Sequence, residues 1–347
     1  MRTYLLPKDG NFYKANLHCH TNVSDGSWTP EQVKEEYQKN GYSIVAYTDH
    51  NVMIAHPELR DETFLPLNGF EADFNEGGST IDPNIGTIRC CHICFISPEE
   101  ENPRQLCFHR SEYLFHGNNK KNAALVNYDR EAPDYVRSYT PECINSYVKE
   151  FKDAGFFVTY NHPTWSMECY REFSQYRGFD AMEICNYGCY SAGFDEENSR
   201  YYDDMLHLGM RIGCIGADDN HNHHPRDHAK WDSFGAFTYI KAPALTYKDV
   251  FAALKDGNYY ASRGPVIEEL YFEDGKVHVK CSPARRISLM LGTRRGDSRI
   301  GIDGSTITEA TFDVSERDVY FRLTVWDEQG RPAHTRAYFV DTLFQIP

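Results

Sequence analysis

Two histidines one residue apart, His18 and His20, stand in the segment NLHCHTNVSD, which ends with the carboxylate of Asp25. Residues i and i+2 of a β-strand point to the same face, so a strand over residues 17–21 would direct both imidazoles toward one cation. Imidazole is a common metal ligand, and Asp25 adds a hard oxygen ligand nearby. An isolated H-x-H is equally typical of a surface or hydrogen-bonded pair, so the rest of the chain decides between the two interpretations.

More residues of these chemical types follow along the chain. They are Asp49 and His50 in VAYTDHN, Glu71 in LNGFEADF, His92 in RCCHICFISP, His162 in TYNHPTW, and Asp218, Asp219 and His221 in IGADDNHN. Together with the H-x-H pair and its aspartate, this ordered set resembles the PHP family, the polymerase and histidinol phosphatase superfamily of metal-dependent phosphoesterases. Each piece alone is unspecific, whereas the complete order from His18 to His221 is highly specific.

The resemblance implies a set of nine metal ligands. One cation takes about four to six ligands, so nine groups suit two or three divalent cations that share a bridging carboxylate, for which Glu71 is the candidate. Mixed imidazole and carboxylate ligation suits zinc, manganese or iron, and the sequence does not choose among them. The nine ligands are His18, His20, Asp25, His50, Glu71, His92, His162, Asp219 and His221.

In two motifs, an aspartate could either bind the metal or support a neighbouring ligand. In the T-D-H motif we expect His50 to be the ligand and Asp49 to orient it, although Asp49 also offers a ligating oxygen. The late motif, GADDNH, departs from the usual family spelling G-S-D-x-H and allows either Asp219 or Asp218 as the ligand. Only Asp219 pairs with His221 at the family spacing, so we prefer it and expect Asp218 to support the ligands.

His92 and Arg263 each have a structural interpretation beside the functional one. His92 lies in an apolar run, where a lone histidine is usually a core residue with satisfied hydrogen bonds, and the family resemblance favours the ligand. Arg263, in ASRGP, either binds a substrate anion or is a turn residue that joins two domains. Among the histidines that the ligand set does not include are His56, His109, His116, His223, His224 and His228.

A unit of helix, glycine, buried strand and candidate ligand recurs three times. The first copy begins with a capping box at Thr29 and a proline at the first helical position, and a glycine ends the helix of each copy. This alternation indicates a parallel sheet, and an α/β barrel gathers its active site at the carboxyl ends of such strands. The predicted helix and strand pairs are 30–40 with 43–48, 141–154 with 156–160, and 196–208 with 211–215.

Two domains are expected. The resemblance implies a distorted (β/α)7 barrel, in agreement with the alternation, and we assign residues 1–264 to it. From residue 265 onward, short segments alternate apolar and polar residues between closely spaced turns, which predicts a small antiparallel β-sandwich over residues 265–347. Glu273, Asp274 and Gly275 lie between two such segments and predict a hairpin. The sandwich has no ligand cluster and is expected to pack on the barrel or on another subunit.

Two stretches of the barrel domain are predicted as irregular. Residues 75–83 are glycine-rich and read as a loop. Residues 98–140 form a polar excursion, and such an excursion from a barrel serves as a lid, a substrate loop or a contact within a homo-oligomer. The sequence does not choose among these three roles.

Composition excludes several classes of protein. The net charge of −15 and the absence of a basic stripe argue against binding to long nucleic acid. No apolar run reaches the roughly 18 residues of a transmembrane helix, and the first residues do not form a signal peptide. The 11 cysteines follow no regular frame and many lie in apolar runs, so we expect free thiols in a reducing cytoplasm. A small anionic substrate remains compatible with the acidic chain, because bound cations reverse the local potential.

The expected chemistry follows from the metals. A bound cation lowers the pKa of its water, and a pair of cations can clamp a phosphoryl group. The sequence shows no nucleophile elbow, P-loop or Rossmann fingerprint, so we predict a metal-dependent hydrolase of a small phosphoester. The alternatives are a carboxylic or carbamate ester hydrolase with the same site and a non-catalytic metal-binding module, which nine ligands argue against. The donor of a proton to the leaving group is not identified.

Overall fold

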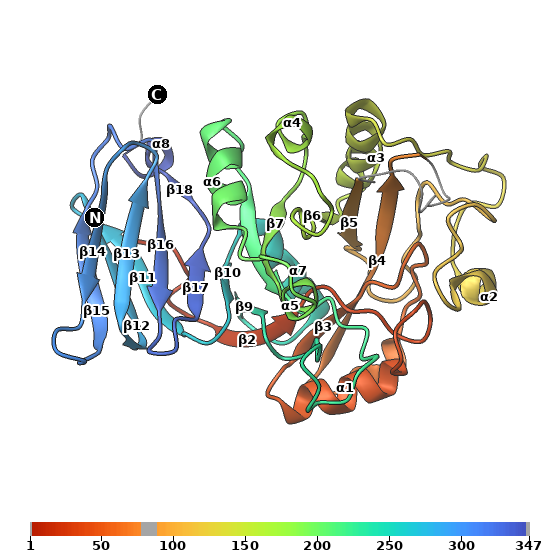
Figure 1. Cartoon of the computed structure of the whole chain (residues 1–347), viewed down its shortest axis with the longest axis horizontal. Coiled ribbons are helices and arrows are strands. Elements are labelled where there is room, and N and C mark those ends of the chain that lie inside the picture. The colour runs from red at the N-terminus through yellow and green to blue at the C-terminus, as the bar shows by residue number, and fades with distance from the viewer. Residues whose placement is uncertain (1, 78–88, 345–347) are drawn as a thin grey trace.

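Most strands belong to one long, curved sheet. The computed structural model describes residues 2–77 and 89–344, and within them this sheet has 14 strands. A second sheet of four strands shares an apolar core with one end of the first (Figure 1). The strands are β1 (Thr3–Tyr4), β2 (Asn11–Asn16), β3 (Ile44–Tyr47), β4 (Leu65–Asn75), β5 (Cys90–Ile96), β6 (Phe157–Tyr160), β7 (Ala181–Asn186), β8 (Gly213–Ala217), β9 (Phe237–Ala242), β10 (Tyr259–Ser262), β11 (Ile267–Glu273), β12 (Lys276–Ala284), β13 (Arg286–Leu291), β14 (Gly296–Ile300), β15 (Ile307–Asp313), β16 (Tyr320–Trp326), β17 (Pro332–Thr335) and β18 (Tyr338–Phe339).

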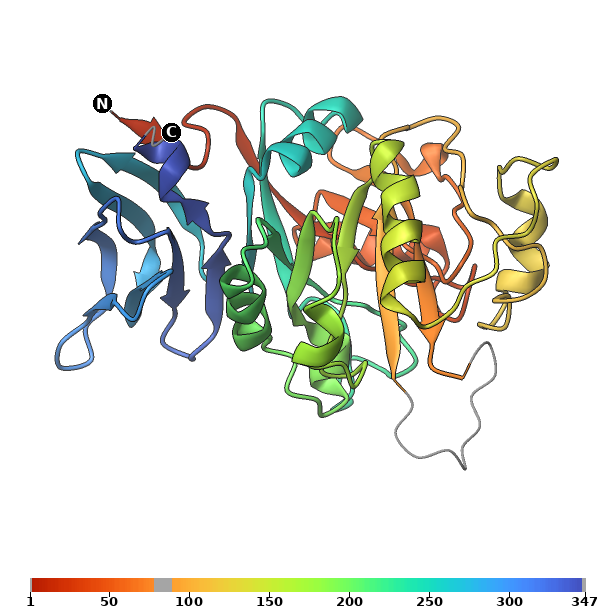
Figure 2. The ribbon, with the colours of Figure 1, turned by 90° about the horizontal axis from the view of Figure 1, so that it is seen from above.

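Helices lie along the outside of the curved part of the sheet (Figure 2). Short 3-10 helices cover Pro57–Leu59 and Ala123–Leu125. Among the helices that the structure describes, none combines the length and the apolar character that crossing a membrane requires. The α-helices are α1 (Pro30–Lys39), α2 (Asn119–Asn122), α3 (Pro141–Asp153), α4 (Tyr170–Phe173), α5 (Tyr187–Ser191), α6 (Ser199–His207), α7 (Tyr247–Asp256) and α8 (Val340–Leu343).

The three predicted units of helix, glycine and strand are confirmed as α1 with β3, α3 with β6, and α6 with β8. The capping box of α1 forms as expected: the Thr29 hydroxyl accepts from the backbone N–H of Gln32 (3.3 Å), and the Gln32 side chain accepts from the N–H of Thr29 (2.9 Å). The third unit differs at its ends, because α6 starts at Ser199 instead of residue 196 and β8 extends to Ala217 instead of residue 215.

The curved part of the sheet is only partly parallel. β2, β3 and β4 pair in parallel, as do β6, β7 and β8, but β5 runs antiparallel to both of its neighbours. β8 returns to the side of β9, where the Thr238 hydroxyl accepts from the N–H of Gly216 (3.1 Å) and donates to its carbonyl (2.9 Å). No backbone ladder joins β8 to β9 within the described residues. The structure thus shows an α/β fold in which one sheet of parallel and antiparallel strands curls back on itself. A closed seven-strand barrel is not shown.

The C-terminal residues form the expected antiparallel sheets. Asp274 and Gly275, both with positive φ (49° and 74°), make the tight turn of the predicted hairpin between β11 and β12. Two features go beyond the prediction. β1 pairs with β11, so the first strand of the chain lies with the sandwich. β17 pairs with β10, so the long sheet continues from the sandwich into the curved part without a break.

Apolar side chains fill the inside of the curved sheet. Ala15, Ile44, Leu67, Phe157 and Ile215, from five strands of this sheet, are all fully buried. Their burial closes one end of the curved sheet and fixes the directions of the strands that carry them. The segments that follow the carboxyl ends of β2, β3, β6 and β8 are left to present polar side chains.

The 98–140 excursion is fixed against two of these segments. The N–H of Asn118 donates to the carbonyl of Ser24 (2.7 Å), the Asn119 side chain donates to the carbonyl of His50 (3.1 Å), and the Gln105 side chain donates to the carbonyl of Asn51 (2.9 Å). The excursion contains α2 and one 3-10 helix. Of the predicted 75–83 loop, residues 78–83 lie outside the described part of the chain.

Candidate metal centre

The H-x-H pair directs both imidazoles to one point, although not from within a strand. Residues 17–21 do not form the strand that was considered for them, because β2 ends at Asn16. Backbone hydrogen bonds hold the following segment extended: the N–H of Asp219 donates to the carbonyl of His18 (2.9 Å), and the N–H of His20 donates to the carbonyl of Asn220 (3.1 Å). The Nε2 atoms of His18 and His20 lie 3.0 Å apart. The same bonds bring the first and last candidate motifs together.

Asp219 and Asp218 face different surroundings. Asp219 Oδ1 lies 3.2 Å from His18 Nε2 and 3.0 Å from His20 Nε2. Asp218 turns away from these histidines and accepts hydrogen bonds from the Tyr37 hydroxyl (2.9 Å) and from three backbone N–H groups of residues 234–236. The structure therefore places Asp219 among the histidines and Asp218 in the packing behind them.

Glu71, on β4, lies at the centre of the cluster and is 1% exposed. Five imidazoles approach its two oxygens. The distances are 3.3 Å from Oε1 to His18 Nε2, 3.2 Å from Oε1 to His92 Nδ1, 3.3 Å from Oε1 to His162 Nε2, 3.4 Å from Oε2 to His20 Nε2 and 3.2 Å from Oε2 to His50 Nδ1. A carboxylate in this position can bridge two cations.

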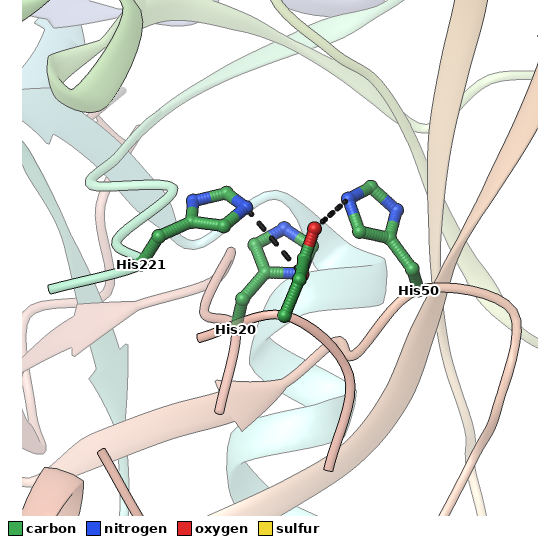
Figure 3. A group of neighbouring side chains, drawn as sticks. His20, His50 and His221 are labelled. Atoms are coloured by element: carbon green, nitrogen blue, oxygen red, sulfur yellow. Dashed lines mark ion pairs between the residues drawn. The ribbon is translucent and has the colours of Figure 1, made fainter. Parts of the chain in front are cut away.

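Asp25, His50 and His221 form a further group beside His20. Asp25 Oδ2 lies 3.7 Å from His50 Nε2, and Asp25 Oδ1 lies 3.6 Å from His221 Nε2 and 3.8 Å from His20 Nδ1. Figure 3 shows the imidazoles of His50 and His221 turned toward that of His20, each from a separate segment of the chain. His20 presents one ring nitrogen to this group and the other to the Asp219 group, so it lies between the two.

Asp49 does not face the cluster but holds the loop that carries Asp25. Its Oδ1 accepts from the N–H of Thr21 (2.8 Å) and from the hydroxyl of Ser24 (2.7 Å), and its Oδ2 accepts from the Thr21 hydroxyl (2.8 Å). With its carboxylate occupied in this way, Asp49 orders the turn between the H-x-H pair and Asp25.

Arg263 lies outside the lining of the cavity into which the cluster opens. Its guanidinium donates to Glu197 Oε1 (2.8 Å) and lies over the ring of Tyr190, 4.1 Å from the ring centroid. It is absent from the residues that line the cavity above the metal-site candidates. In this position Arg263 braces α5, whose residues form part of the cavity wall.

Two candidate ligands are held in an unusual backbone conformation. His162 has a φ of 24° and Asp219 a φ of 52°, in the left-handed region that residues other than glycine rarely adopt. The backbone of His162 is fixed by Glu183, whose Oε2 accepts its N–H (3.0 Å). Strain of this kind persists where the surrounding contacts over-determine it, and it concentrates at functional sites.

The distances between donor atoms fit bound cations. Ligand atoms at about 2.0–2.2 Å from a tetrahedral or octahedral cation lie about 3.0–3.6 Å from each other, and the distances around Glu71 and Asp219 fall in this range. His20 Nδ1, His50 Nδ1 and Asp219 Oδ1 are buried and accept or donate no hydrogen bond, as expected of atoms that bind a cation. Four overlapping groups hold donor atoms within 4.8 Å of one another: His18–His20–Asp219, His18–Glu71–His162, His50–Glu71–His92 and His20–Asp25–His50–His221.

Opposite charges dominate the electrostatics of the cluster. Burial alone lowers the pKa of His20, but the adjacent carboxylates of Asp219 and Glu71 raise it to about 10. Burial alone raises the pKa of Glu71, but the charges of His18 and His92 hold it well below its ordinary value. Imidazolium groups thus balance the carboxylates in the absence of a cation, and a cation that binds must replace those protons.

Comparisons with known proteins show a distant likeness. No family model matches the sequence, and no curated protein matches it closely enough to count as a relative. A solved two-domain protein from Bacteroides vulgatus, described as containing a predicted PHP-like metal-dependent phosphoesterase, is 13% identical, with a TM-score of 0.42 over 97% of this chain and 89% of that chain.

Two other solved structures match a smaller part of the chain. One, from Bifidobacterium adolescentis, is described, as a provisional assignment, as a metal-dependent phosphoesterase; it is 16% identical, with a TM-score of 0.37 over 64% of this chain and 91% of that chain. The other is an amidohydrolase from Chromobacterium violaceum with bound sulfate and no metal, 14% identical, with a TM-score of 0.38 over 60% of this chain and 87% of that chain. These values describe a distant likeness, so the functional argument rests on the donor atoms themselves.

Two residues of the site were not predicted from the sequence. Glu183, in the middle of β7, is fully buried, and its Oε1 accepts from His18 Nδ1 (2.7 Å), which leaves His18 Nε2 for a cation. His116, from the 98–140 excursion, stacks on His50 with ring centroids 3.9 Å apart and lies 3.6 Å from Asp25 Oδ2. Neither residue belongs to a motif that the chain shares with the PHP family. In the sequence, the only indication of a role for Glu183 is that a glutamate occurs within an apolar strand.

The cluster opens into a cavity of about 430 Å³. Four carboxylates line it, and Lys230 is the only lysine or arginine among its described lining residues. A cavity of this volume lies within the range of about 300–1,000 Å³ for small-molecule sites. The donor atoms are therefore reachable by a small substrate.

Proposed function

We propose that this protein is a metal-dependent hydrolase of a small phosphoester, of the PHP type, with two or three divalent cations. The observation that carries the proposal is the buried carboxylate of Glu71, which is surrounded by five imidazoles at 3.2–3.4 Å. Asp219 and Asp25 extend the donor set on its two sides. All nine ligands that the resemblance implies belong to these overlapping groups.

A catalytic role is supported over a structural one. A structural metal site closes with about four ligands and has no free face. Here Asp25, His50, Glu71 and Asp219 line an open cavity, so a substrate can reach the positions that the donors define. Bound cations supply Lewis acids and lower the pKa of a bound water. Imidazole and carboxylate donors suit zinc, manganese or iron.

The chain supplies orientation and charge compensation. Glu183 fixes the tautomer of His18, and Asp49 fixes the loop that bears Asp25. Lys230 places a positive charge at the cavity, where it can meet a phosphate oxygen. The carboxylates of the cluster compensate the charge of the cations, and the cations in turn attract an anionic substrate to an acidic protein.

Metal analysis and a substrate panel test the proposal. We expect two to three metal equivalents per chain after purification without chelator, and turnover of phosphomonoesters or phosphodiesters with manganese, zinc or iron. His50→Ala and His162→Ala should each abolish turnover in a folded protein, whereas His278→Ala, in the sandwich, should not change it. At most one equivalent under metal-replete conditions would refute the multinuclear site. Hydrolysis of carboxylic esters without hydrolysis of phosphoesters would refute the proposed substrate class.

A further inference from the structure

Trp165 presents an aromatic face at the cavity. It is 38% exposed and lines the same cavity as the metal-ligand candidates. Its ring contacts two of those candidates, tilted against His92 with ring centroids 5.2 Å apart and nearly perpendicular to His162 with ring centroids 5.0 Å apart. A large apolar side chain that is partly exposed gains free energy when a ligand covers it, and this one contacts two of the imidazoles that are candidate ligands.

The backbone at Trp165 is held by hydrogen bonds. Its backbone N–H donates to Glu196 Oε1 (2.5 Å), and the neighbouring Thr164 hydroxyl donates to Asn198 Oδ1 (3.0 Å). Glu196 is fully buried, and burial raises its pKa to about 7. An aromatic platform that is held in this way loses little conformational freedom when a second ring stacks on it.

The remaining walls offer an anionic substrate few permanent positive charges. Lys230 is the only lysine or arginine among the described lining residues, which also include the small side chains of Cys189 and Ala192. A phosphate group therefore depends on the cations and on Lys230. The organic part of the substrate must therefore bind to the cavity wall, where the indole of Trp165 offers the largest apolar surface.

We propose that the organic part of the substrate carries a flat aromatic ring, which stacks on Trp165 while the phosphoester lies against the cations. This proposal rests on the proposed function and adds the substrate class. Rings stacked on an indole gain both apolar burial and favourable π-contact. Two sources share this chemistry: an aryl phosphate, with the ring on the ester oxygen, and a nucleotide, with the ring beyond a sugar.

Two phosphonates that the enzyme cannot hydrolyse test the platform by binding. Phenylphosphonate and methylphosphonate share one head group and differ in the ring, and their affinities can be measured by calorimetry on metal-loaded and on metal-free protein. We expect phenylphosphonate to bind about 5- to 100-fold more tightly to the parent protein. Trp165→Leu should remove most of this advantage, and Trp165→Phe should retain more of it. Tyr170→Leu, an exposed aromatic outside the cavity, is the matched control and should keep the full advantage.

Turnover separates the two sources of the ring. The loss in kcat/KM caused by Trp165→Leu should be at least about 5-fold larger for an aromatic substrate than for glycerol phosphate, and should appear mainly in KM. A loss that is largest for phenyl phosphate identifies an aryl ester. A loss that is largest for adenosine monophosphate identifies a nucleotide.

The possible failures are distinguishable. Equal affinities of the parent protein for the two phosphonates would overturn the platform and leave the phosphoesterase proposal standing. Equal losses for both phosphonates in Trp165→Leu, together with loss of metal, would also overturn it, because Trp165 would then only support His92 and His162. If the metal-loaded parent bound neither phosphonate and hydrolysed no phosphoester, the proposed function itself would fail. In the parent protein, quenching of tryptophan emission by phenylphosphonate, absent in Trp165→Phe, tests the stacking even if Trp165→Leu does not fold.

Discussion

Asp218 and Asp219 are neighbours in sequence, but the carboxylate of Asp219 faces the histidines and that of Asp218 accepts hydrogen bonds behind them. Substitution of each residue tests this difference. Asp219→Asn removes an ionised group that lies 3.0 Å and 3.2 Å from two imidazoles. We expect metal content to fall and turnover to drop more than about 100-fold, since even the residues that merely orient ligands are worth about 10- to 100-fold. Metal content and turnover are measured for both variants side by side.

Asp218→Asn is the matched variant. Burial raises the pKa of Asp218 to about 6, while the hydrogen bonds from Ala236, Phe234 and Tyr37 lower it. The amide keeps the shape but loses acceptor capacity, so we expect a stability loss of about 1–3 kcal/mol with metal content largely retained. A dead Asp218→Asn protein beside a nearly normal Asp219→Asn protein would show that the ligand at this motif is Asp218.

Metal binding is expected to release protons near neutral pH. The pKa of His20 is raised to about 10, so the metal-free site holds a proton there that a cation must displace. The apparent affinity should therefore rise about tenfold per pH unit for each displaced proton, and this gain should end near the raised pKa. Calorimetry at about pH 7.5 in two buffers of different ionisation enthalpy counts the protons, and we expect at least one. Heats that do not depend on the buffer, with an affinity that does not change with pH, would contradict this.

At the scale of single residues, the sequence indicated the members of the candidate cluster better than it indicated the residues that contact and orient them. Histidines in H-x-H and T-D-H occur at recognisable spacing, so type and order were enough to single out His18 and His50. Glu183 and His116 act through contacts that only the folded chain creates: 165 residues separate Glu183 from His18, and His116 reaches Asp25 from an irregular excursion. No local pattern encodes such contacts.

The 98–140 excursion packs so closely on the Asp25 loop at Gly117 that the methyl group of an alanine would not fit there. Gly117 has a φ of 50°, and a β-carbon there would overlap the backbone oxygen of Ser24 and lie 2.7 Å from Cα of Asp25. Gly117→Ala should displace the excursion from the Asp25 loop and remove about one metal equivalent from the Asp25, His50 and His221 group. Metal analysis of the purified variant measures this.

Gly209→Ala provides the control for Gly117→Ala. Gly209 also has a positive φ (82°), but a β-carbon there meets nothing within 4 Å. Both variants carry the backbone cost of alanine in the left-handed region, and only Gly117→Ala adds the overlap. Full metal content in both proteins would show that the excursion does not hold the Asp25 loop.

At the scale of elements, the sequence predicted what local signals specify. Capping residues, glycines and apolar runs predicted α1 and β3, and period-two alternation predicted the hairpin of β11 and β12. The direction of β5 was not predictable, because an apolar strand reads the same in a parallel and an antiparallel pair. The pairing of β17 with β10 joins residues that are distant in sequence, and a register of that kind is set by tertiary packing alone.

The whole molecule is tied together by a continuous sheet and by a buried ion pair. Arg322, on β16 of the sandwich, is 1% exposed and makes a bidentate contact with Asp203 on α6: Nε to Oδ1 at 2.7 Å and NH2 to Oδ2 at 2.8 Å. Removing one partner of such a pair leaves the other charge buried without compensation. The two parts of the chain should therefore lose their structure together.

Arg322→Met tests this coupling. We expect it to cost about 3–5 kcal/mol in the free energy of unfolding, whereas Arg299→Met, which breaks an exposed pair with Asp297, should cost at most about 1 kcal/mol. Circular dichroism follows the whole fold during heating, and a colorimetric chelator follows release of metal from the site. Because one sheet runs from β14 to β8, both signals should change at the same temperature, and that temperature should fall in Arg322→Met. Metal release at an unchanged temperature, after a separate and earlier loss of dichroism, would show instead that residues 1–264 unfold independently of residues 265–347.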